Sequence, residues 1–102
     1  MNQDNLKLIL DEVKSIAIVG VSSNPERDSY KVMKFLQDYG FDVFPVNPKL
    51  VKTKILDQEC YSSLEAIKEK VDMVDVFRAI EHIPSIANEA INIKAKILWT
   101  QE

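Results

Sequence analysis

Residues 16–20, Ile16-Ala17-Ile18-Val19-Gly20, form a short unbroken apolar run that ends in glycine. Such a run is typical of a strand that is buried on both faces, the kind found in parallel sheets. Similar runs recur along the chain, and the stretches between them carry apolar residues at helical spacing. The further strands are predicted at 41–46, 71–77 and 96–99, and the helices at 29–39 and 84–93. Alternating strands and helices predict an α/β fold, a Rossmann-like doubly wound parallel sheet.

Capping residues mark the ends of the helix predicted over 29–39. Asp28 or Ser29 can cap the helix over 29–39, and Gly40 can end it as a residue in the left-handed conformation. Apolar residues at helical spacing also predict an N-terminal helix over 6–13, before the first strand.

The segment between the second and third strands has less pattern. Residues 49–61 follow no clear period and are predicted to be irregular. Ser62 and Glu65 have the spacing of a capping box, in which each side chain bonds the backbone N–H of the other residue. This spacing predicts a short helix that continues to about Lys70.

The composition bounds the class of protein. A chain of 102 residues, 46% of them hydrophobic, is expected to form one domain over 1–102. The net charge of −3 argues against general nucleic-acid binding, and no apolar run approaches the roughly 18 residues of a membrane span. A single cysteine, Cys60, and a single histidine, His82, exclude a disulfide framework and a zinc finger, so no metal is expected. With no visible signal peptide, a reducing, cytoplasmic location is expected.

Three loops follow the predicted strands, over 20–28, 47–54 and 78–84. In open parallel sheets, ligands bind beyond the carboxyl ends of the strands, near the point where the strand order reverses. The first loop joins a glycine turn to hydroxyl and amide groups and then to a helix N-terminus, where free N–H groups favour phosphate. The position of this loop favours phosphate binding over a plain strand-to-helix turn.

The kind of phosphate ligand can be narrowed further. The dinucleotide fingerprint G-x-G-x-x-G is absent, because no further glycine follows Gly20 in this loop. The place where an acid would bind the ribose of NAD holds Asn47-Pro48, followed by Lys49. A cation there suits an extra phosphate on the ribose, as in NADP or coenzyme A, so NAD is disfavoured.

The sequence gives little support for catalysis. No nucleophile elbow and no acid–histidine pair is evident, so His82 and Cys60 are expected to be a surface residue and a small buried hydrophobe. The lysines at 49, 52 and 54 can simply be solvated. Arg78 is more informative, because it directly follows a buried strand at the ligand-bearing edge, although it could instead pair with Asp75 or Glu81.

Together these stretches strongly resemble a known family. Residues 16–30, 46–48 and 71–78 are similar to the small bacterial CoA-binding domain proteins, and 95–101 resembles a late strand of that family. Those proteins are similar in turn to the CoA-binding N-terminal domain of the succinyl-CoA synthetase alpha subunit. The resemblance extends over nearly the whole chain, from Ile16 to Gln101.

The resemblance implies binding of coenzyme A or an acyl-CoA by a module without chemistry of its own, such as a sensor, carrier or partner subunit. The catalytic phosphohistidine of the synthetase belongs to a later domain, so His82 inherits no role from it. The implied pyrophosphate site is the first loop, the adenosine part lies against the second loop with Lys49 near its phosphate, and the third loop lines the other side. Carried over by position, the binding residues are Gly20, Val21, Ser22, Ser23, Asn47, Pro48, Lys49, Val76, Phe77 and Arg78.

The family pattern also implies a further helix and a last strand, whereas the sequence stops at Glu102. The strand over 96–99 is therefore expected to be an exposed edge, which could pair two copies into a homodimer. Two other functions stay open from the residues alone: a fragment of an NADP-dependent oxidoreductase, and a ligand-free protein-interaction domain that uses this edge.

Overall fold

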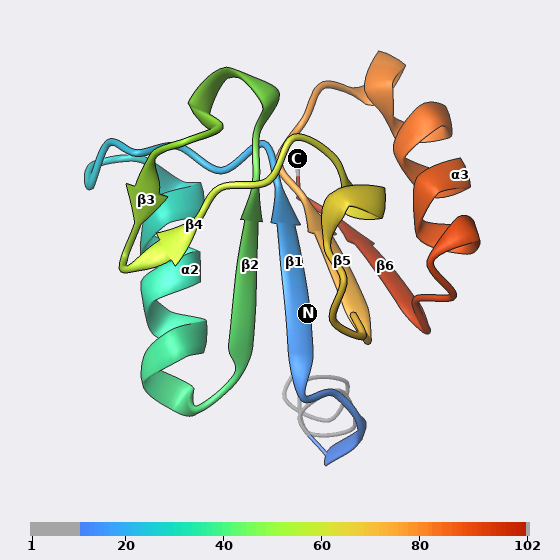
Figure 1. The fold of residues 1–102 in the computed structure, drawn as a ribbon, viewed down its shortest axis with the longest axis horizontal. Coiled ribbons are helices and arrows are strands. Elements are labelled where there is room, and N and C mark those ends of the chain that lie inside the picture. Colours follow the sequence, from blue (N-terminus) through green and yellow to red (C-terminus); the bar gives the residue numbers. More distant parts are fainter. Residues whose placement is uncertain (1–10, 102) are drawn as a thin grey trace.

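The computed structural model describes residues 11–101, and most of the helix predicted over 6–13 lies outside them. Four parallel strands form one sheet in the order β2-β1-β5-β6 (Figure 1). The α/β prediction is thereby confirmed, and the four predicted strands and the helices predicted over 29–39 and 84–93 begin and end within a few residues of their expected places. The strands are β1 (Ser15–Val19), β2 (Asp42–Val46), β5 (Met73–Val76) and β6 (Ile97–Thr100), and the helices are α2 (Asp28–Tyr39) and α3 (Ile83–Asn92).

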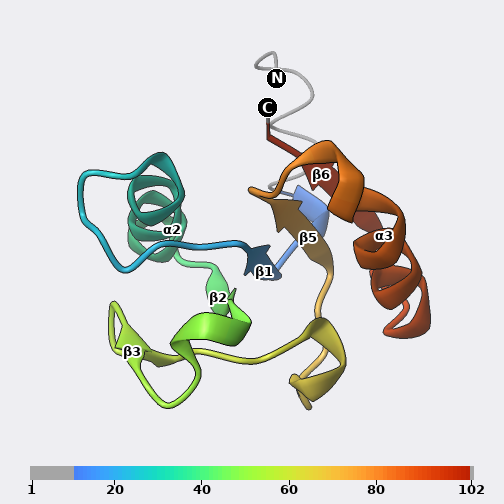
Figure 2. The same cartoon turned by 90° about the horizontal axis from the view of Figure 1, so that it is seen from above.

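The sheet is covered on both faces by different helices (Figure 2). On one face, Met33 of α2 packs in a cluster with Ile16 and Ile18 of β1. On the other face, Ile86 of α3 packs in a cluster with Ala17 of β1. Every residue of β1 is buried, which explains why this strand is an unbroken apolar run rather than an alternating one. The doubly wound architecture is therefore confirmed.

The strand order reverses between β1 and β5. From β1 the chain crosses through α2 to β2, and from β5 it crosses through α3 to β6, on the opposite side of the sheet. The two connections leave the sheet in opposite directions, so the loops after β1 and β5 diverge at its carboxyl end. This is the topological switch point at which open α/β sheets bind ligands.

The start of α2 differs from its prediction. Arg27 is the N-cap residue, and neither Asp28 nor Ser29 caps the helix with its side chain. The Ser29 hydroxyl is buried and instead accepts a hydrogen bond from the backbone N–H of Ser22, at 2.9 Å, so it ties down the loop before the helix. The predicted end is confirmed, because Gly40 follows the helix with φ of 111°.

The segment predicted to be irregular contains a small antiparallel hairpin, formed by β3 (Lys54–Ile55) and β4 (Gln58–Glu59). Ile55 is fully buried in the cluster on the α2 face of the sheet. The prediction that 49–61 is irregular is therefore wrong at these residues, since the hairpin adds a short second sheet beside β2. A 3₁₀ helix, Pro48–Leu50, precedes it.

The predicted capping box at Ser62 and Glu65 is wrong. Only a 3₁₀ helix over Leu64–Ala66 forms there, with Ser63 as its N-cap and no side-chain cap. The backbone N–H of Leu64 donates instead to Glu89 Oε1 on α3, at 3.2 Å. A partner distant in the sequence thus satisfies the N–H group at the start of this turn. The helix ends at Ala66 and does not continue to Lys70 as predicted.

The amino edge of the sheet is closed by Asp72, which immediately precedes β5. Its Oδ2 accepts the backbone N–H groups of Lys14, at 2.9 Å, and Ser15, at 3.3 Å, and its own N–H donates to Ser15 Oγ at 2.9 Å. The hydrogen bond from Lys14 is the main reason why the pKa of the Asp72 carboxyl lies below its usual value, and the one from Ser15 acts in the same direction. Burial of Asp72 acts the other way. Asp72 therefore joins the starts of β1 and β5.

Candidate functional site

The carboxyl edge of the sheet is built around Gly20, the first residue after β1. Gly20 has φ of 85°, and a Cβ atom placed on it would lie 2.5 Å from the carbonyl oxygen of Phe77 and 2.7 Å from Arg78 Cδ. The backbone N–H of Phe77 also donates to Val19 O at 2.8 Å. Only glycine allows the turn after β1 to approach the chain after β5 this closely.

The loop that follows is held by its own polar groups. The N–H of Ser22 is bonded to Ser29, and Ser22 Oγ accepts the N–H of Asn24 at 3.0 Å. Asn24 Oδ1 in turn accepts the N–H of Glu26, also at 3.0 Å. The backbone donor at Ser22 is thus already used within the loop, so an anion held here would depend more on neighbouring side chains than the glycine turn alone suggests.

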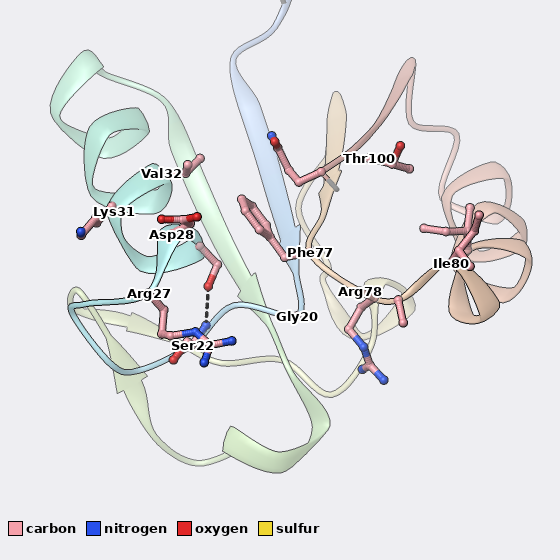
Figure 3. Close-up of a pocket in the computed structure, with 14 residues that line it drawn as sticks. Gly20, Ser22, Arg27, Asp28, Lys31, Val32, Phe77, Arg78, Ile80 and Thr100 are labelled. Carbon is pink, nitrogen blue, oxygen red and sulfur yellow. Dashed lines mark hydrogen bonds between the residues drawn. The ribbon is translucent and has the colours of Figure 1, made fainter.

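A cavity of about 940 Å³ opens beside Gly20, between the start of α2 and the segment after β5 (Figure 3). Three cationic side chains line it and one carboxylate opposes them, so the balance favours an anionic ligand. In Figure 3, Arg27 and Arg78 lie on either side of the Gly20 turn. The polar and charged lining is Ser22, Arg27, Asp28, Ser29, Lys31, Arg78, Thr100 and Gln101, and the apolar lining includes Val32, Phe77, Ile80 and Ile83.

A second, smaller cavity of about 130 Å³ lies on the α3 side. Arg78 lines this cavity as well as the larger one, so its side chain stands between them. Pro48 and the exposed His82 also line it, with Ser62, Ser63 and Ser85 supplying hydroxyl groups. The two cavities together provide a two-part space at the carboxyl edge of the sheet, with Arg78 at its middle.

Asn47, the first residue after β2, connects two of the loops at the carboxyl edge of the sheet. Its Nδ2 donates to Val21 O at 2.9 Å, and its Oδ1 accepts the N–H of Lys49 at 3.0 Å. Asn47 thereby links the first and second loops and caps the 3₁₀ helix that carries Lys49, which is exposed.

The structure brings together only part of the site that the sequence predicts. Gly20, Ser22, Phe77 and Arg78 share the larger cavity, and Pro48 meets Arg78 at the smaller one. The side chains of Val21 and Val76 are fully buried, so only their backbones could face a ligand. Three more predicted residues line neither of these cavities, and their contact with a ligand stays a prediction: Ser23, Asn47 and Lys49.

Several residues that line the larger cavity were not predicted. Asp28, Lys31 and Val32 lie at helical spacing in the first turns of α2. Because this helix starts directly after the first loop, its first turns could have been predicted to line the site. Ile80 and Ile83 belong to the segment that leads into α3. Gln101 comes from the end of β6 and depends on strand order, which the sequence does not specify.

The titratable groups near the site offer little for metal or thiol chemistry. Within residues 11–101, no group of three or more His, Cys, Asp or Glu side chains is arranged to hold a metal ion. Cys60 is buried, and this burial raises the pKa of its thiol. Its Sγ donates to Asn47 O at 3.6 Å. The expectation that Cys60 is a small buried residue is confirmed.

These features define a Rossmann-like α/β domain with its cavities at the topological switch point. A protein-family model described as a CoA binding domain matches residues 14–102, and the chain belongs to that family. None of the helices in the part of the chain that the structure describes is long and apolar enough to cross a membrane.

Relatives of known sequence agree with this assignment. Over 97 residues the chain is 39% identical to the uncharacterised protein YneT of Bacillus subtilis, covering 95% of this chain and 70% of that protein. It is also 31% identical over 80 residues to the alpha subunit of acetate–CoA ligase (ADP-forming) I of Pyrococcus furiosus. The second match covers 74% of this chain but 17% of the ligase subunit, so it concerns one domain of a larger enzyme.

Solved structures show the same fold. A hypothetical protein from Pyrococcus horikoshii is 38% identical, with a TM-score of 0.88, over 97% of this chain and 68% of that one. The fold and family that the sequence resemblance implied are therefore confirmed, through the CoA-binding domains of ligases rather than through the synthetase itself.

Proposed function

We propose that this chain binds coenzyme A or an acyl-CoA at the carboxyl edge of its sheet, as a binding or regulatory module without chemistry of its own. The observation that carries the proposal is the place of Arg78, which lines both cavities beside the Gly20 turn. Coenzyme A is itself a two-part ligand, in which a nucleotide is joined through a pyrophosphate to a long thiol arm. A guanidinium between two cavities suits such a ligand, because it can bond phosphate oxygens with two parallel N–H groups.

The linings of the cavities suggest which end of the ligand goes where. The smaller cavity has Pro48 in its wall, and Lys49 is next to it in the chain, so we assign the adenosine part to this side. The extra phosphate would lie toward Lys49 and away from Glu89, the carboxylate that lines this cavity. The larger cavity has the apolar side chains of Val32, Phe77 and Ile83, which suit the thiol arm and a short acyl group. The pyrophosphate would then lie near Gly20 and Arg78.

The proposed module would act in the cytoplasm and could form a homodimer. The free Cys60 is compatible with a reducing compartment. In the described part of the chain, β6 is the last strand of the sheet order, and Leu98 within it is exposed, so pairing of two copies through β6 is open to test by the solution mass at high concentration.

The experiment is calorimetric titration of the purified chain with CoA, acetyl-CoA and NADPH. We expect CoA or acetyl-CoA to bind more tightly than NADPH, and Arg78→Ala to weaken binding about tenfold, since a charge-assisted hydrogen bond contributes about 1.5 kcal/mol or more. Lys49→Glu should weaken it less, because Lys49 is exposed and screened by salt. Lys34→Glu is the matched control, on a lysine of α2 that pairs with Asp38 and lines neither cavity.

The outcomes separate the alternatives. Tighter binding of NADPH would favour the NADP-dependent oxidoreductase fragment. No binding of any of the three ligands at millimolar concentration would favour the ligand-free interaction domain. Equal weakening by the changes at Lys49 and Lys34 would remove Lys49 from the site.

A further inference from the structure

Asp75 is a buried carboxylate that contacts Gln101 in the wall of the larger cavity, and none of the roles described above uses it. It lies on β5, between Ile18 of β1 and Trp99 of β6 in the sheet register, with 3% of its surface exposed. Its hydrogen-bond donor within residues 11–101 is Gln101, whose Nε2 lies 3.1 Å from Oδ1 and 3.4 Å from Oδ2. Both carboxylate oxygens thus share one neutral amide group.

This contact fixes the direction of the Gln101 amide. An ionised carboxylate can only accept hydrogen bonds, so the NH₂ group of Gln101 must turn toward Asp75. The backbone N–H of Gln101 is bonded to Val76 O at 2.8 Å, which holds the residue at the end of β6. Gln101 lines the larger cavity and Asp75 does not, so the carbonyl oxygen of the side chain is left to serve the cavity as an acceptor.

We propose that Gln101, oriented by Asp75, receives the sulfur end of the thiol arm, so that the cavity favours the free thiol over its acyl thioester while Asp75 is ionised. This inference rests on the proposed binding of coenzyme A. A thiol can donate a hydrogen bond to the Gln101 carbonyl oxygen, whereas a thioester offers only acceptor groups there. Asp75 is a positioning residue in this scheme, and Gln101 is the specificity-determining one.

The preference should reverse when Asp75 takes up a proton. Burial raises the pKa of Asp75 to about 6, although the hydrogen bond from Gln101 acts the other way. A protonated Asp75 donates its O–H, and the Gln101 amide can then turn its carbonyl oxygen to accept it. The NH₂ group would face the cavity and donate to a thioester carbonyl, so acidification should favour the acylated ligand.

No charged side chain within residues 11–101 forms a hydrogen bond or an ion pair with Asp75. Its neighbours in the sheet, Ile18 and Trp99, are not charged, and no ion pair within residues 11–101 involves it. The charged side chains that line the cavity are Arg27, Asp28 and Lys31 at the start of α2 and Arg78 after β5. Their effect on the phosphates is common to the free and acylated ligands, so a ratio of two affinities removes it.

The test is the ratio of the acetyl-CoA Kd to the CoA Kd, measured by calorimetry from pH 7.5 to pH 5.0. We expect the wild type to bind CoA about fivefold more tightly than acetyl-CoA at pH 7.5, which corresponds to one neutral hydrogen bond. The ratio should fall to one or below at pH 5.0. The ligand phosphates also titrate in this range, but they act on both ligands alike.

Three variants separate positioning from a structural role. Asp75→Asn cannot ionise and should make the ratio independent of pH, and Gln101→Met should bring it to about one at every pH. Asp28→Asn, which removes a carboxylate of the same cavity, should keep the wild-type pH dependence. A flat ratio in the wild type, with both ligands bound, overturns this inference alone. Absence of binding by both ligands at every pH overturns the proposed function and this inference with it.

Discussion

The two edges of the sheet carry aspartates that are three residues apart and behave in opposite ways. Asp72, at the amino edge, accepts two backbone N–H groups, and its pKa is lowered. Asp75, toward the carboxyl edge, has one neutral amide partner in the described part of the chain, and burial raises its pKa to about 6. Both are buried, so burial alone does not decide the charge of a carboxyl group. At Asp72 the hydrogen bond from Lys14 outweighs the effect of burial, whereas at Asp75 burial outweighs the hydrogen bond from Gln101.

This difference assigns separate tasks to the two edges. The amino edge is closed by hydrogen bonds that are complete within the protein, as expected of a purely structural contact. The carboxyl edge leaves groups such as Gln101 and Arg78 at cavity walls, where a ligand can use them. We therefore expect changes at the amino edge to act on folding, and changes at the carboxyl edge to act on binding as well.

The largest effect should follow substitution of Gly20, where the carboxyl edge is most crowded. Gly20→Ala would place a Cβ atom 2.5 Å from Phe77 O at a positive φ, so the free energy of unfolding should fall by about 3–4 kcal/mol. Gly40→Ala is the matched control, because Gly40 has φ of 111° but nothing within 4 Å, and it should cost only about 1 kcal/mol.

Urea unfolding of the two glycine variants measures this difference. Equal losses would mean that the left-handed backbone matters at Gly20 and the close approach to the chain after β5 does not. CoA binding by whatever folded fraction of the Gly20 variant remains should also be weaker, whereas the Gly40 variant should keep the wild-type affinity.

The next largest effect should come from the amino edge. Asp72→Ala leaves the N–H groups of Lys14 and Ser15 without their acceptor, so we expect a loss of about 2–3 kcal/mol at pH 7. Because the folded pKa of Asp72 is lowered, its ionised form adds stability above its ordinary pKa of 3.8 and loses it as the pH falls through the folded value. The wild type and the variant should therefore approach each other below about pH 4.

Unfolding in urea at pH 7 and pH 3 tests this expectation. The control is Asp38→Ala, which removes an exposed carboxylate paired with Lys34 on α2 and should cost less than about 0.5 kcal/mol. A loss that does not depend on pH would show that Asp72 stabilises the edge by packing rather than by its charge.

The main elements of the fold were predictable because burial on both faces leaves a direct trace in the sequence. The apolar run over 16–20 and the helical spacing in α2 follow from that burial. The hairpin of β3 and β4 left no such trace, since each strand has two residues. Its turn uses Leu56 and Asp57 at positive φ, without the glycine that usually marks such a turn.

The candidate site was predictable only where its residues directly follow buried strands. Gly20, Phe77 and Arg78 directly follow buried strands, so their place at the carboxyl edge follows from the fold class. The contact between Asp75 and Gln101 joins residues 26 apart and requires β6 to lie beside β5. Nothing in the spacing of these residues along the chain marks them as partners.

The smallest of these effects should be a gain of stability at Asp75. Its folded pKa, about 6, lies above its ordinary value of 3.8, so the native state holds the proton more tightly and the ionised form is penalised at neutral pH. Asp75→Asn removes that penalty and should stabilise the protein by about 1–2 kcal/mol at pH 7.5. The gain should shrink as the pH falls from 6 toward 4, because the wild-type carboxyl is then neutral in the folded state and increasingly so in the unfolded one. Urea unfolding at pH 7.5 and pH 4 measures it, and a destabilised Asn variant at pH 7.5 would mean that the Asp75 charge supports the fold, as at Asp72.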